Sequence, residues 1–128
     1  QTANGYAPGT PVVPGTTYTS WQASYALGVD LIQNTYRDAE LWLMTLLPIH
    51  GHSDTNTAKI AQANVCIKAI AKHFGVKVID QANGYITQEN SYLYGHDEGT
   101  AIRSLHPNIQ GMELMMRVIV EEMYRQLP

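Results

Sequence analysis

Residues 74–80 read Phe74-Gly75-Val76-Lys77-Val78-Ile79-Asp80, the junction between a helix and a short strand. The segment before this junction has apolar residues at helical spacing, namely Ile60, Ala63, Ile67, Ile70 and Phe74. This spacing predicts a helix that begins near Ser53 or Asp54 and buries one face. Gly75 can supply the left-handed residue that often ends a helix. Residues 76–80 are therefore predicted as a strand.

The chain before this junction predicts another helix and another strand. Ser20 is a plausible N-cap, and an apolar stripe follows at spacings of three and four: Trp21, Tyr25, Val29, Ile32 and Tyr36. Residues 40–47 then form an almost unbroken apolar run that Pro48 ends. Such a run is typical of a strand buried on both faces of a parallel sheet. Residues 1–19, rich in glycine and proline, predict an irregular segment.

The chain after the junction predicts a long loop and a last helix. Residues 81–105 are polar and aromatic without periodicity, and loops of that length in compact domains are usually functional. Pro107 suits the first turn of the last helix. The predicted inner face of that helix is Ile109, Met112, Met115 or Met116, Ile119 and Met123.

The order of these elements predicts an α/β protein with a parallel sheet and right-handed crossovers. Two strands are too few to cover three amphipathic helices, because sheets usually have about four to six strands. We therefore expect the sheet to be completed by strands from outside this chain. They would come from an upstream segment, another chain or a swapped copy.

Composition narrows the function classes. The chain has 128 residues, the size of one domain, and a formal charge of −3 without a basic cluster, so we expect no nucleic-acid partner. No apolar run reaches the length of about 20 residues that a membrane span needs. The single cysteine, Cys66, excludes an internal disulfide and falls on the apolar side of its helix. Nothing in the sequence decides the compartment, and no cofactor motif is present.

The segment Ser104-Leu105-His106-Pro107-Asn108-Ile109-Gln110-Gly111 precedes the last helix. It resembles the His-Pro-Asn-x-x-Gly motif of the SGNH (GDSL-type) serine hydrolases, which delivers the general base just before the final helix. The resemblance implies a three-layer flavodoxin-like fold, of which residues 1–128 would be the C-terminal segment. It also implies that His106 takes the proton of a catalytic serine.

The resemblance extends over most of the chain. Residues 39–45 stand where the family carries a strand that ends in threonine, and residues 74–80 are similar to its strand before the catalytic loop. The segment Thr2-Ala3-Asn4-Gly5 resembles the Gly-x-Asn-Asp block, which makes Asn4 the implied oxyanion donor. Thr2 and Gly5 depart from that pattern.

Two departures concern the catalytic machinery. The Gly-Asp-Ser block and the glycine block have no counterpart, so the resemblance implies that the nucleophile lies in an upstream segment or a second chain. The family's acid stands three residues before the histidine, where this chain has Arg103, a cation that disfavours an imidazolium. Asp97 or Glu98 would then serve as the acid, or the enzyme would use a Ser-His dyad.

The implied function is hydrolysis of acyl esters, with acetyl groups on carbohydrate among the substrates. One alternative is a non-catalytic binding or structural module on the same scaffold, which Arg103 favours. Another is an unrelated flavodoxin-like binding domain, but no glycine-rich turn follows a strand. His50 and His52 lack a third ligand at metal-site spacing, so we expect no metal.

Overall fold

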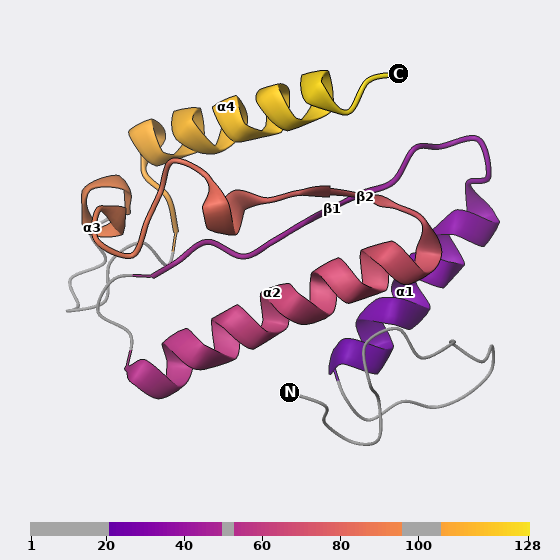
Figure 1. Cartoon of the computed structure of the whole chain (residues 1–128), viewed down its shortest axis with the longest axis horizontal. Helices are drawn as coiled ribbons and strands as arrows, with labels where there is room; N and C mark the ends of the chain where they lie inside the picture. Colours follow the sequence, from indigo (N-terminus) through magenta and orange to yellow (C-terminus); the bar gives the residue numbers. More distant parts are fainter. Residues whose placement is uncertain (1–20, 50–52, 96–105) are drawn as a thin grey trace. The chain divides into compact units, whose positions relative to one another are not determined.

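A computed structural model describes residues 21–49, 53–95 and 106–128 (Figure 1). The elements in chain order are α1 (Trp21–Thr35), β1 (Trp42–Met44), α2 (Asp54–Phe74), β2 (Lys77–Ile79), the 3₁₀ turn η1 (Gln81–Asn83), α3 (Ser91–Tyr94) and α4 (Ile109–Arg125). The described residues fall into two compact units. The first unit holds residues 21–43 and 62–78, and the second unit holds residues 44–49, 53–61, 79–95 and 106–128. The mixed α/β character predicted from the sequence is confirmed, although most elements are helical.

The sheet among the described residues is a parallel pair, β1 beside β2. Both strands are shorter than the predicted runs 40–47 and 76–80. Within this chain the first strand is covered on one face, because Leu43 and Thr45 are buried whereas Met44 and Leu46 are exposed. This alternation is that of a strand with one covered face.

The first unit is built around small side chains of α1. Its core consists of Ala23, Ala26, Val29, Leu43, Ile67, Ile70 and Ala71. The predicted stripe of α1 is only partly right, because Val29 is buried but Trp21, Ile32 and Tyr36 are exposed. Helical periodicity alone predicts that the large apolar side chains form the buried face of α1. Alanines, however, allow the backbone of α1 to pack more closely against its neighbours. The buried face of α1 is therefore the one that carries Ala23 and Ala26.

Local signals fix both ends of α2. The Ser53 hydroxyl accepts a hydrogen bond of 3.2 Å from the Asn56 amide, so Ser53 caps the helix as predicted. Gly75 has a φ of 67°, in the left-handed region. The amide of Val76 donates to the carbonyl of Ala71 at 3.0 Å, and that of Gly75 donates to Lys72 at 3.4 Å. This pair of bonds is the Schellman arrangement, which satisfies carbonyls that the helix end leaves open.

In the second unit, α4 contacts α3 and η1 (Figure 1). The described residues leave most of the predicted inner face of α4 uncovered, because Ile109, Met112, Met116 and Met123 are exposed. Gly111 and Val118 are buried instead. The long loop predicted over residues 81–105 is interrupted by η1 and α3. None of the described helices is both long and apolar enough to span a membrane.

Candidate functional site

His106 is the one implied catalytic residue that the structure describes. Asn4 lies outside the described residues, and so does Asp97. Arg103 and Glu98, on which the question of the acid depends, lie outside them as well. The roles of these residues stay predictions.

His106 is exposed, two residues before the N-cap of α4. The next residue, Pro107, forms an isolated antiparallel bridge with Gly95, at the end of α3. A residue before proline is restricted to extended backbone conformations. The imidazole therefore extends from a backbone that is constrained on its C-terminal side.

Asn108 fixes the start of α4. Its side-chain oxygen accepts a hydrogen bond of 2.8 Å from the amide of Gly111, so Asn108 is the N-cap of α4. Pro107 consequently precedes the cap and does not occupy the predicted first turn of the helix. The side-chain nitrogen of Asn108 donates to the carbonyls of Leu93 at 3.0 Å and Gly95 at 3.4 Å. The backbone amide of Asn108 donates to Tyr94 at 2.8 Å.

Gly111 is required by a close approach of α4 to the end of α3. A β-carbon at this position would overlap the carbonyl oxygen of Tyr94 and lie 3.1 Å from the β-carbon of Pro107. Since the nearest atom belongs to the backbone, no side-chain rotation can relieve the overlap. The asparagine and glycine of the motif thus hold the start of α4 against the end of α3, and His106 lies two residues before Asn108.

A hydrogen-bond network joins the carboxyl ends of the two strands within the second unit. The buried Thr45 hydroxyl donates to the Asp80 carboxylate at 3.0 Å and accepts from the Ala82 amide at 2.9 Å. The amide of Thr45 donates to the carbonyl of Ile79 at 3.1 Å. Sequence reasoning missed this network, although a threonine and an aspartate that each follow a strand are a recognisable signal.

The segment after β1 is also tied to the segment before α3. The side-chain amide of Gln88 donates a hydrogen bond of 2.7 Å to the carbonyl of Ile49. Thr45 and Ile49 therefore hold the segment that follows β1 at two points. In parallel α/β folds, binding sites lie beyond the carboxyl ends of the strands.

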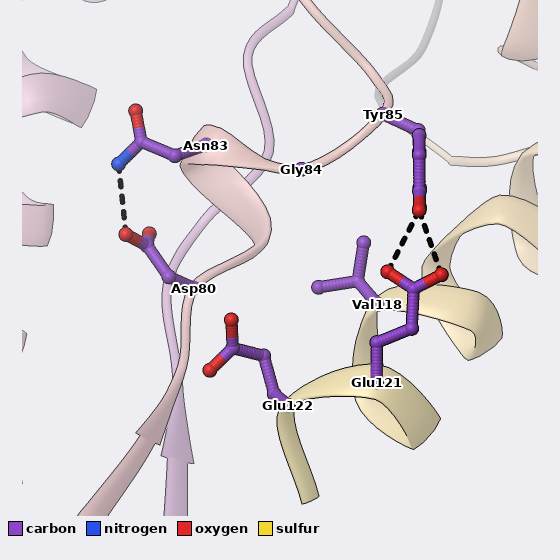
Figure 2. A pocket seen from close by; sticks show the side chains of 7 residues that line it. All are labelled: Asp80, Asn83, Gly84, Tyr85, Val118, Glu121 and Glu122. Atoms are coloured by element: carbon purple, nitrogen blue, oxygen red, sulfur yellow. Dashed lines mark hydrogen bonds between the residues drawn. The ribbon is translucent and has the colours of Figure 1, made fainter. Parts of the chain in front are cut away.

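An acidic pocket of about 250 Å³ lies between η1 and the C-terminal half of α4 (Figure 2). It is lined by Asp80, Asn83, Gly84, Tyr85, Val118, Glu121 and Glu122. Sequence reasoning did not anticipate this pocket, because its residues come from segments far apart in the chain. His106 does not line it.

The carboxylates of this pocket are engaged by neighbouring side chains. The Tyr85 hydroxyl donates to both carboxylate oxygens of Glu121 at 2.7 Å (Figure 2), a bond that raises the pKa of Tyr85. Glu122 pairs with Arg125, and Asp80 accepts from Asn83 at 2.8 Å. Within the described ranges, no group of three or more histidine, cysteine, aspartate or glutamate residues is arranged to hold a metal. The pocket is therefore explained by packing and by these internal bonds.

A shallow, mostly apolar groove lies at the N-terminal end of α4. Its lining consists of Pro107, Asn108, Ile109, Gln110 and Met112. The exposed Ile109 and Met112 supply apolar surface at the N-terminal end of α4. His106 is not among the residues that line this groove.

Comparison with protein families, curated proteins and solved structures finds no match to this chain.

Proposed function

We propose that this chain is the C-terminal segment of an SGNH-type serine ester hydrolase, with His106 as its general base. The observation that carries the proposal is the arrangement of residues 106–111 at the start of α4. It presents an exposed histidine immediately before a capped helix. The motif therefore has a physical basis, since its asparagine caps the helix and its glycine admits the carbonyl of Tyr94.

The reaction requires a serine from outside residues 1–128. His106 removes the serine proton as the serine oxygen attacks the ester carbonyl, and the imidazolium then returns that proton to the leaving alcohol. Water then attacks the acyl-serine as the imidazole takes its proton, and the imidazolium returns that proton to the serine oxygen as the acid leaves. Asn4 would donate to the oxyanion and Asp97 would orient the imidazole.

The apolar groove at the start of α4 supports an acyl ester as substrate. Its apolar lining from Ile109 and Met112 would accept a short acyl group, with acetyl groups on carbohydrate among the candidates. The alcohol portion of the ester would extend away from this groove.

Uncovered apolar surface supports the proposal that further strands complete the sheet. Met44 is exposed on β1, and Leu46 is exposed just beyond it. The apolar side chains exposed along α4 are Ile109, Met112, Met116, Val120 and Met123. Burial of apolar surface contributes about 25 cal/mol per Å². Strands and helices of an upstream segment or a second chain would gain this contribution by covering both surfaces.

The proposal is tested with a fluorophosphonate probe, which labels activated serines. The isolated chain should stay unlabelled, whereas the complete protein that includes the Gly-Asp-Ser block should label. Stoichiometric labelling of residues 1–128 alone would contradict the proposal.

A non-catalytic module on the same scaffold is the second candidate. Arg103 favours it, because a cation three residues before the histidine opposes the imidazolium that catalysis requires. Failure of the complete protein to label or to hydrolyse any ester would select this candidate.

A further inference from the structure

We propose that Asn108 is a positioning residue for His106, a role that deepens the proposed function and rests on it. Asn108 links the end of α3 to the start of α4 through both its backbone and its side chain. Three successive carbonyls, of Leu93, Tyr94 and Gly95, accept hydrogen bonds from this one residue. Its side-chain oxygen accepts at the same time from the Gly111 amide.

The asparagine side chain is the one that fits both tasks. Its carbonyl oxygen caps α4, and its NH₂ group donates to the last carbonyls of α3, which the helix end leaves open. An aspartate would keep the cap but would set a carboxylate against the carbonyls of Leu93 and Gly95. A serine would keep the cap but would be too short to reach both helices.

Few free backbone torsions separate Asn108 from the backbone of His106. The intervening Pro107 has a fixed φ and is paired with Gly95. His106 itself is restricted because it precedes a proline. A shift of Asn108 relative to α3 is therefore transmitted to the backbone of His106 with little attenuation.

Substitution of Asn108 by aspartate separates a positioning role of this residue from a role in folding. Aspartate is as good an N-cap as asparagine, and its charge suits the N-terminus of a helix. Asn108→Asp should therefore leave α4 formed while it removes the two side-chain hydrogen bonds to Leu93 and Gly95. Misplacement of a catalytic group by about 1 Å can cost about 100-fold in rate.

Asn90 offers a matched control in the second unit. Its side-chain nitrogen donates to the carbonyl of Tyr85 at 3.0 Å, and its side-chain oxygen accepts from the Thr87 amide at 2.7 Å. Asn90→Asp thus breaks an equivalent bond at the other end of α3. A loss common to both variants would report general destabilisation.

The experiment measures the ring NMR signals of His106 in the complete protein, together with kcat and KM on a chromogenic acetyl ester. We expect Asn108→Asp and Asn108→Ser to shift or broaden the His106 ring signals and to leave those of His73 unchanged. In both variants, kcat should fall by about 10-fold to 100-fold at a nearly constant KM. Asn90→Asp should change neither quantity.

The outcomes separate the two proposals. A wild-type protein without ester hydrolysis would end the proposed function, while the ring signals would still decide whether Asn108 positions His106. Unchanged His106 signals in Asn108→Asp would overturn the positioning role even if the esterase is active. Loss of the folded state in both Asn108 variants, seen by circular dichroism, would also overturn it and make Asn108 a folding residue.

Discussion

The carbonyl oxygen of Tyr94 occupies the space that a β-carbon on residue 111 would need, so α4 can pack against the end of α3 only with glycine at this position. Glycine inside the first turn of a helix is unfavourable on propensity alone. The close approach explains why this residue type stands there. It also gives the motif around His106 a structural requirement that is independent of catalysis.

Gly111→Ala should destabilise the protein by about 1–3 kcal/mol, because the overlap with a backbone atom outweighs the gain in helix propensity. The measurement is the free energy of unfolding in urea. Gly28→Ala is the matched control within α1, since no atom lies within 4 Å of its β-carbon. That variant should gain about 0.5–1 kcal/mol. Equal effects of the two substitutions would show that α4 does not approach Tyr94 closely.

Thr45→Val should cost about 1–3 kcal/mol, because it leaves the Ala82 amide without its acceptor and removes a donor from Asp80. Thr45→Ser keeps the hydroxyl and removes one buried methyl group, so its cost should be about 0.8 kcal/mol. Urea unfolding of both variants measures the difference. A valine variant as stable as the serine variant would contradict the role of this network.

Stability should decline at alkaline pH through Tyr25. Burial raises the pKa of Tyr25 above its ordinary value, since the phenolate is disfavoured in the folded state. Both states are protonated below pH of about 10, where the full stability is present. Above that pH the unfolded chain ionises first, so the free energy of unfolding falls as pH rises through the pKa of the folded state.

The check on this prediction is urea unfolding at several alkaline pH values. Tyr25→Phe should reduce the slope of stability against pH. Tyr36→Phe, a change at an exposed tyrosine beyond α1, is the control and should leave the slope unchanged. A steeper decline of the free energy of unfolding with pH in Tyr25→Phe would contradict a raised pKa of Tyr25 in the folded state.

The elements that local signals define are the ones that the sequence predicts best. Ser53 and Gly75 mark the ends of α2 through hydrogen bonds to residues at most a few positions away. The coarse α/β order follows from such signals.

The buried faces of α1 and α4 could not be predicted from periodicity. The apolar residues of α4 extend around more than one face, so contacts from distant segments select which face is covered. Val118 packs against Gly84, where the β-carbon of any other residue would overlap the Val118 side chain. The hydrogen bonds from Asn108 to α3 could not be predicted either, because nothing in the sequence of residues 91–95 indicates that their carbonyls bond to Asn108.

The most direct test of the account is turnover of an acetyl ester by the complete protein after His106→Ala, with His73→Ala as the control. His73 lies exposed near the end of α2, in the first unit. Loss of a general base should lower kcat by about 100-fold to 10,000-fold, while His73→Ala should retain wild-type turnover. Unchanged turnover in the His106 variant would contradict the assignment of the general base.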